Sequence, residues 1–295
     1  DSAVAAALSR SASLSETEAA LGVRSSLAPR LKTADTTLDG PVRLRFHSRG
    51  AISSLFIEPQ LNVSPPQDGE VLVRVHAVGL NFRDVLNVLG EYPGDPGPPG
   101  GDMAGTIRDA NAFGHLAVGD ATFGIGNAPL ASVARAFAPI LADKPAALAF
   151  AQACTPPLTW CTTHVAIERA FLRARFSIIV QAAAGGVGLK ALEYAQWLNA
   201  FSLGTAGRPH KHAQLRATRV GALISSRDGM GFASGAMRLL DGSRAQAVLN
   251  SLSLDFIAAS FASLGERGAF EEIGKIGIWT SERRAAAAAR PLYCA

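Results

Sequence analysis

The residues whose pattern points most directly to chemistry are the small residues of AAAGGVG, at positions 182–188. They follow the apolar, β-branched run 177–181 and precede leucines and alanines at helical spacing, so the local pattern predicts strand, tight turn and helix. Glycines let a backbone turn sharply and approach a ligand, and the free N–H groups of the following helix suit a pyrophosphate. The run therefore predicts the first βα unit of a dinucleotide-binding domain. Because the strict GxGxxG spacing is absent, a glycine-containing turn in some other α/β domain is the alternative.

A basic stretch beyond the next expected strand, 201–205, indicates which dinucleotide would bind. In NAD-binding folds a carboxylate about 20 residues past the glycines holds the ribose 2′-hydroxyl, but no acidic residue occurs between Glu193 and Asp228. The basic and imidazole side chains of the stretch are Arg208, His210, Lys211, His212, Arg216, Arg219 and Arg227. Cationic groups attract the 2′-phosphate that a carboxylate would repel. The sequence therefore predicts NADPH, with Arg208 and Lys211 near the ribose, and a solvated helix face is the alternative.

Alternating strand and helix patterns would position these residues. The expected strands are 176–181, 201–205, 220–224, 246–250 and 269–273, and the expected helices between them are 187–198, 211–218, 232–240 and 254–264. Strands and helices in this order predict a parallel, doubly wound α/β sheet.

The residues before this sheet have a different pattern. Runs at 42–46, 54–57 and 70–77 alternate with period two and are separated by glycine and proline turns, which predicts a small β-barrel-like domain up to about residue 145. A helical stretch, 145–171 with a break at Pro156, would join the two. We expect residues 1–40 to be a linker or the tail of a preceding domain, 41–165 to be the β-barrel domain and 166–295 the nucleotide-binding domain.

Composition and charge exclude several function classes. Hydrophobic residues make up 48% of the 295 residues, and the net charge of +4 is scattered rather than gathered with aromatics, so nucleic-acid binding is not expected. No apolar run is long enough to span a membrane. The three cysteines, Cys154, Cys161 and Cys294, form no CxxC and fit no zinc site, which favours a reducing, cytoplasmic location and no metal. Cys154 and Cys161 are expected to be buried apolar residues rather than nucleophiles.

Several ordered motifs, spread over about residues 42–280, carry a family resemblance. Besides AAAGGVG they are VGLNFRDVL (78–86), GEYPG (90–94), PGGDMAG (99–105), VLNSLS (248–253) and EIGKIGIW (272–279). Together they resemble the enoyl reductase domain of modular polyketide synthases and animal-type fatty acid synthases, in the zinc-free branch of the medium-chain dehydrogenases that also holds quinone oxidoreductases.

The resemblance implies a fold and a reaction. The fold would be a GroES-like β-barrel catalytic domain followed by a Rossmann domain. The reaction would transfer a hydride from NADPH to the β-carbon of an α,β-unsaturated thioester carried on an acyl carrier protein, and a proton to the α-carbon. Other domains of a synthase would be further partners.

The resemblance also assigns roles residue by residue. Tyr92 matches a proposed α-proton donor, although a tyrosine packed in a loop is the alternative. Lys211 matches a lysine of cofactor binding or protonation, and Asp228 lies near the position of its acidic partner. The matching cofactor residues are Asn81, Ala183, Gly185, Gly186, Val187, Gly188, Asn250, Ser251, Gly274 and Lys275.

Departures from the family pattern leave alternatives open. Asp102 stands where the family usually has Glu, and the glycines after Asp228 make its register uncertain. The family continues for one more Rossmann strand and then returns to the catalytic domain, so we expect a C-terminally truncated domain and a fragment of a larger synthase. A free-standing NADPH quinone or enone oxidoreductase, or a non-catalytic structural remnant, are the alternative functions.

Overall fold

The protein is described by a computed structural model, which divides into two compact units, 1–40 and 41–295. The described residues are 20–21, 26–27, 40–61, 63–111, 116–218, 220–252, 255–275, 279–280, 282–283 and 292–294. In the first unit β1 (Ala20–Leu21) pairs antiparallel with β2 (Ser26–Leu27), a pairing that the sequence analysis did not predict. The rest of this unit, apart from Gly40, lies outside the described residues, so its role as a linker stays a prediction.

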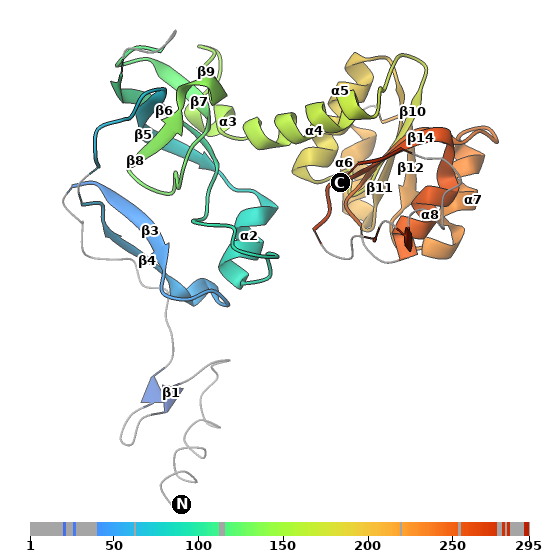
Figure 1. Cartoon of the computed structure of the whole chain (residues 1–295). Coiled ribbons are helices and arrows are strands. Elements are labelled where there is room, and N and C mark those ends of the chain that lie inside the picture. Colours follow the sequence, from blue (N-terminus) through green and yellow to red (C-terminus); the bar gives the residue numbers. More distant parts are fainter. Residues whose placement is uncertain are drawn as a thin grey trace, which may run out of the picture. The chain divides into compact units, whose positions relative to one another are not determined.

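The first half of the second unit consists of antiparallel strands (Figure 1). Strands β3 (Val42–Phe46) and β4 (Leu55–Pro59) form a two-stranded sheet. A five-stranded sheet has the order β8-β5-β6-β7-β9. Its strands are β5 (Glu70–Gly79), β6 (Asp102–Ala110), β7 (Ala121–Ile125), β8 (Val133–Phe137) and β9 (Leu141–Asp143). Short 3-10 helices span Ile52–Ser54 and Ala138–Ile140, and helix α2 spans Phe82–Leu89. The alternating pattern of the sequence therefore predicted the type of structure here.

Helices α3 (Phe150–Ala153) and α4 (Pro157–Arg169) connect the two halves of this unit. The predicted break falls at Pro156, but residues 145–149 are not helical. The Lys144 ammonium donates there to the carbonyl oxygens of Pro145 and Leu148, at 3.0 and 2.6 Å, within a turn. The expected boundary between 165 and 166 falls inside α4 and stays a prediction.

The second half contains a six-stranded parallel sheet of order β12-β11-β10-β13-β14-β15. The strands are β10 (Ser177–Val180), β11 (Phe201–Ala206), β12 (Ala222–Ser225), β13 (Ala245–Asn250), β14 (Leu264–Glu272) and β15 (Leu292–Cys294). The helices are α5 (Gly186–Trp197), α6 (Pro209–Arg216), α7 (Gly229–Leu239) and α8 (Asp255–Ser263). The strand order reverses beside β10, which is the position where doubly wound sheets bind ligands.

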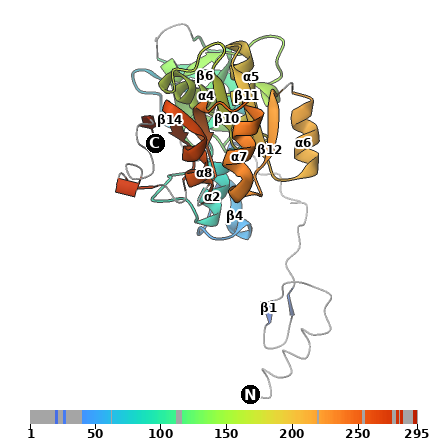
Figure 2. The same cartoon turned by 90° about the vertical axis from the view of Figure 1, so that its right-hand side faces the viewer.

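Helices cover both faces of this sheet because its central strands are apolar on both faces. Ile178 and Val180 of β10 pack with α4, α5 and α6 on one face. Ile179, which points the opposite way, packs with α7 and α8. Figure 2 shows α7 and α8 in front of the sheet. The predicted α/β class with a doubly wound sheet is therefore confirmed.

Strand β15 corrects one expectation about this sheet. The sequence analysis predicted five strands and placed the next strand beyond the chain. Residues 292–294 instead pair in parallel with β14, with Ala269 opposite Leu292. The alanine-rich composition before this strand hid it, because short strands without an alternating pattern give no periodic signal. Among the described residues, no helix is long and apolar enough to cross a membrane.

Candidate functional site

The glycine loop forms the turn between β10 and α5, as predicted. Gly185 is the N-cap of α5, with an extended backbone, and the loop is tied to β11 because Ala183 donates its N–H to the Thr205 carbonyl at 2.9 Å. A Cβ on Gly188 would lie 2.6 Å from the Ala182 carbonyl oxygen and 2.7 Å from that of Ala183. Only glycine fits at this position, because both neighbours are backbone atoms.

A pocket with a volume of about 440 Å³ lies at the carboxyl ends of these strands. It is lined by Ala182, Ala184, Gly185, Thr205, Ala206, Gly207, Arg208, Lys211, Ser226, Arg227 and Leu252. The pocket brings together three of the predicted cofactor residues, Gly185, Arg208 and Lys211. All of its charged lining residues are cationic. An anionic ligand with one phosphate at the glycine loop and another among the cations would fit these walls.

Arg227 also lines the pocket; the sequence analysis named it in the basic stretch but did not place it near the ribose. It follows β12, and Gly207 makes room for it: a Cβ on Gly207 would lie 2.6 Å from the Arg227 Nε. The signal that could have found it is its place just past the expected strand 220–224, at the same edge as Arg208.

Four other predicted residues of the glycine loop are not among the lining residues of the pocket. Gly186, Val187 and Gly188 form the first turn of α5, and Ala183 is buried against β11. A Cβ on Gly186 would lie 3.2 Å from the Thr159 methyl carbon of α4. These four residues shape the turn and its packing, and a direct role in binding stays a prediction.

A buried polar cluster joins the ends of β13 and β14, where Asn250 and Glu272 are paired residues. The fully buried Asn250 amide donates to the Leu252 carbonyl at 2.8 Å and to Glu272 Oε2 at 2.7 Å. Glu272 Oε1 accepts the Gly274 N–H at 2.7 Å, and burial raises the pKa of Glu272. The cluster therefore fixes Leu252, which lines the pocket. Sequence reasoning selected Asn250 and Gly274 but missed Glu272, which connects them.

Two further predicted residues surround this cluster. Ser251 donates its hydroxyl to the Gln181 carbonyl at the end of β10, at 3.4 Å. Lys275 is exposed, and its positive charge opposes the rise in the Glu272 pKa. The carboxyl ends of β10, β13 and β14 are thus linked by side chains, and the roles of both residues toward a ligand remain predictions.

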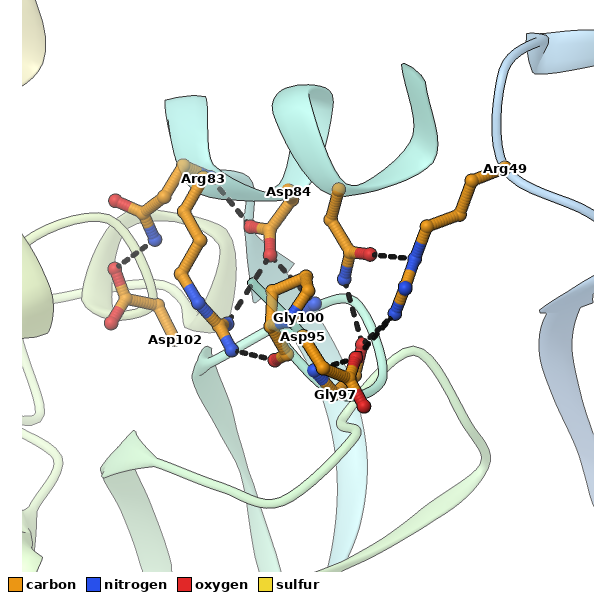
Figure 3. A network of polar contacts seen from close by, with 10 residues as sticks. Arg49, Arg83, Asp84, Asp95, Gly97, Gly100 and Asp102 are labelled. Carbon is orange, nitrogen blue, oxygen red and sulfur yellow. Dashed lines mark hydrogen bonds and ion pairs between the residues drawn. The ribbon is translucent and has the colours of Figure 1, made fainter. Parts of the chain in front are cut away.

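In the antiparallel half, Asn81 follows β5 and is hydrogen-bonded to two buried carboxylates, Asp84 and Asp102. Figure 3 shows these two carboxylates. The Asn81 backbone N–H donates to Asp84 Oδ2 at 2.9 Å, and its amide donates to Asp102 Oδ2 at 3.0 Å. Asp102 Oδ1 accepts the Leu158 N–H in the first turn of α4 at 2.9 Å. Burial, and to a lesser degree the charge of Asp84, raises the pKa of Asp102 to about 6. This carboxylate therefore titrates near neutral pH.

The same network holds the loop that carries Tyr92. Figure 3 shows Arg49 and Arg83 reaching this loop from either side. Arg49 donates to Asp95 Oδ1 at 2.7 Å, and Arg83 donates to the Pro96 carbonyl. The half-buried Tyr92 ring lies 5.9 Å from the Arg83 guanidinium carbon. Tyr92 is therefore held near α2, the helix whose N-cap is Asn81.

Asp228 is placed differently from the expectation that it partners Lys211. It is the N-cap of α7, where its Oδ1 accepts the Gly231 N–H at 2.8 Å. Over the part of the chain that the structure describes, no ion pair joins Asp228 to Lys211, and no hydrogen bond or cation–π contact joins Tyr92 to Lys211. The catalytic roles of these three residues stay predictions.

The predicted burial of the cysteines is confirmed for Cys154 and not for Cys161. Cys154 is buried, and burial raises the pKa of its thiol, so it is no nucleophile at neutral pH. Cys161 is exposed on α4, and the prediction that it is buried is wrong. Its position on the solvent face of an otherwise apolar stretch could not be read from composition. Within the described ranges, no group of three or more His, Cys, Asp or Glu side chains could hold a metal ion.

Comparison with known proteins assigns the fold to a family. Residues 67–133 match the alcohol dehydrogenase GroES-like domain. The chain is 38% identical, over 260 residues, to erythronolide synthase EryA2 of Saccharopolyspora erythraea. This alignment covers 85% of the chain and 7% of that synthase. The crystal structure of the CurK enoyl reductase superposes with a TM-score of 0.81 at 33% identity, covering 86% of this chain and 80% of that one. The chain belongs to the enoyl reductase domains of polyketide synthases.

The quinone oxidoreductases share the fold of this enoyl reductase domain. The Escherichia coli quinone oxidoreductase, solved in complex with NADPH, is 24% identical with a TM-score of 0.75, and the match covers 86% of this chain and 80% of that one. At this identity the likeness shows the fold alone. The predicted resemblance to polyketide synthase enoyl reductases within the medium-chain dehydrogenase/reductase family is confirmed.

Proposed function

We propose that this domain is an NADPH-dependent enoyl reductase that reduces the α,β double bond of an enoyl thioester. The observation that carries the proposal is the pocket at the strand ends, where the glycine loop meets three cationic side chains and no acidic one. Family membership supports the reaction class, and the pocket supports the cofactor.

The residues of the pocket fit a phosphorylated dinucleotide. The N-terminus of α5 offers free N–H groups for the pyrophosphate, and Gly185 leaves its approach open. Arg208, Lys211 and Arg227 would hold the 2′-phosphate, because guanidinium and ammonium groups form charge-assisted hydrogen bonds with phosphate oxygens. The Escherichia coli quinone oxidoreductase, which has this fold, was solved with NADPH bound.

The chemistry divides between the cofactor and the protein. Bound NADPH would supply the hydride that forms the new bond at the β-carbon of the thioester. The electron pair of the double bond moves toward the thioester carbonyl, and the resulting enolate takes one proton at its α-carbon. We propose Tyr92 as the candidate donor, and Lys211 as the alternative donor if it does not hold the 2′-phosphate. Asp228, whose Oδ1 accepts the Gly231 N–H, would serve Lys211 through its second carboxylate oxygen.

The relatives support an inference about the carrier of the substrate. The chain spans 7% of EryA2, so the substrate and partners of the whole synthase are inferences for this domain. We infer an acyl carrier protein with an enoyl chain on its phosphopantetheine arm, together with neighbouring synthase domains. A free-standing reductase would instead act on a small quinone or enone.

The test is NADPH oxidation by the purified chain, with crotonyl-pantetheine thioester and with a quinone in parallel. Thioester turnover supports the proposal. Quinone turnover alone favours the free-standing reductase, and a folded protein that binds NADPH but turns over neither favours a structural remnant. The Tyr92→Phe and Lys211→Ala variants should each reduce the rate if the substituted residue donates the proton. The variant that retains the lower rate identifies the main donor.

The cofactor assignment has a separate test. An Arg208→Gln, Arg227→Gln double variant should raise the Kd of NADPH by about tenfold or more and leave that of NADH almost unchanged, because only NADPH carries the 2′-phosphate. Arg216→Gln, an exposed residue in the last turn of α6, is the matched control. Equal losses for both cofactors would contradict the assignment.

A further inference from the structure

Glu272, the last residue of β14, is a buried carboxylate that holds two chain segments at once. Its Oε1 accepts the Gly274 N–H at 2.7 Å, and its Oε2 accepts a hydrogen bond from the Asn250 amide, also at 2.7 Å. The same NH2 group of Asn250 donates to the Leu252 carbonyl at 2.8 Å. Hydrogen bonds therefore lead from Glu272, through Asn250, to Leu252 in the wall of the nucleotide pocket.

The carboxylate acts on the direction in which the Asn250 amide faces. An ionised carboxylate only accepts hydrogen bonds, so Glu272 requires the NH2 of Asn250 on its side rather than the oxygen. Asn250 is fully buried, and its oxygen has no hydrogen-bond partner among the described residues. No described donor therefore holds the amide the other way round. Glu272 reinforces the one orientation in which Asn250 can also bind the Leu252 carbonyl.

The surroundings of Glu272 support its charged form. Burial raises the pKa of Glu272, and its hydrogen bonds from Asn250 and Gly274 and the positive charge of Lys275 oppose that rise. The fit is close, because a Cβ on Gly274 would lie 2.7 Å from Glu272 Oε1. A side chain at position 274 would therefore displace the carboxylate.

Leu252 differs from the other described residues that line the pocket. They are cationic, hydroxyl-bearing, alanine or glycine, whereas Leu252 is large and apolar. The cations and the glycine loop suit phosphate groups, which leaves the apolar wall for the base of a nucleotide. We propose that Glu272 is a positioning residue of this pocket: through Asn250 it holds Leu252 where its side chain packs against the base of the bound nucleotide. This inference rests on the proposed function, in which the nucleotide is NADPH.

The isosteric variant Glu272→Gln tests this role. The backbone N–H of Gly274 would hold the oxygen of the new amide, so its NH2 would face the NH2 of Asn250. If Asn250 turns to relieve this contact, its oxygen faces the Leu252 carbonyl, which is also an acceptor. The Kd of adenosine 2′,5′-bisphosphate should therefore rise about fivefold or more. The Kd of inorganic pyrophosphate, which has no base, should stay unchanged. Glu266→Gln, at an exposed residue of the same strand, is the matched control.

A double-mutant cycle distinguishes this role from a general structural one. Leu252→Ala removes the apolar wall and should weaken binding of the bisphosphate but not of pyrophosphate. In that background Glu272→Gln should have no further effect on bisphosphate binding, although it still lowers the free energy of unfolding. If the Glu272→Gln variant does not fold, Glu272→Asp takes its place in the cycle, because it keeps the charge and is too short to reach both donors.

Three results would overturn the inference. The first is unchanged binding of the bisphosphate in a folded Glu272→Gln or Leu252→Ala variant. The second is an equal loss of bisphosphate and pyrophosphate binding in Glu272→Gln, which would mean a general disturbance of the pocket. The third is a loss that persists in the Leu252→Ala background. A folded wild-type protein that binds neither NADPH nor the bisphosphate would instead refute the proposed function, so the two failures are distinguishable.

Discussion

At the scale of single residues, Asp102 links the stability of the protein to pH. Its pKa in the folded protein is about 6, above the ordinary 3.8, so between these values the native state binds more protons than the unfolded one. The free energy of unfolding should therefore fall by about 3 kcal/mol from this group as the pH rises from about 4 to about 7. Denaturant titrations should show this fall in the wild type and in the control Asp109→Asn, at an exposed residue of the same strand, and not in Asp102→Asn. Equal pH dependence in all three proteins would contradict the assignment.

Gly188 is a second residue whose effect can be predicted from contacts. Gly188→Ala places a methyl group 2.6 Å from the Ala182 oxygen, so the loop must move. We expect a loss of stability of about 2 kcal/mol or more and weaker NADPH binding. Gly265→Ala is the control, because its nearest neighbour, the Ala245 oxygen, would be 3.6 Å away. Unfolding free energies and Kd values measure both effects, and similar losses in the two variants would show that the loop is not specially constrained.

At the scale of elements, buried Asp84 joins α2 to the loop that precedes β6. It accepts the Asn81 N–H at the start of α2 and the Gly100 N–H of the loop, at 2.9 and 2.8 Å. Asp84→Asn replaces one acceptor by a donor and should cost about 1–3 kcal/mol in denaturant unfolding. Asp95→Asn, in the same network but largely exposed, should change stability little. A comparable loss in both variants would mean that burial is not what gives Asp84 its importance.

At the scale of the whole molecule, the nucleotide pocket exists only when distant segments fold together. Its walls come from the glycine loop, the segment 205–211, Arg227 and Leu252. A ligand that binds only the folded state stabilises it, by about 2.7 kcal/mol at about 100 times its Kd. At the same concentration, NADPH should therefore raise the free energy of unfolding by more than NADH does. The midpoints of denaturant unfolding curves measure this difference. The Arg208→Gln, Arg227→Gln variant should lose the difference, and equal shifts in the wild type would contradict the assignment of the 2′-phosphate site.

The sequence by itself determined the local elements and the region of the site. The period-two runs predicted antiparallel strands, and the run AAAGGVG predicted the β10–α5 turn, because neighbours in the chain produce both patterns. The absence of acidic residues between Glu193 and Asp228 predicted the cationic wall of the pocket. These signals depend only on residue type and spacing.

The tertiary structure decided which side chains meet. Asp102 and Leu158 are 56 positions apart, and Asn250 and Glu272 are 22 apart, so no periodicity connects them. Arg227 joins the pocket only because β12 pairs beside β11, and β15 forms only against β14. Hydrogen bonds and charges act over a few ångströms in space, whereas sequence patterns record only distance along the chain. For this reason the sequence located the site, and the fold determined its polar contacts.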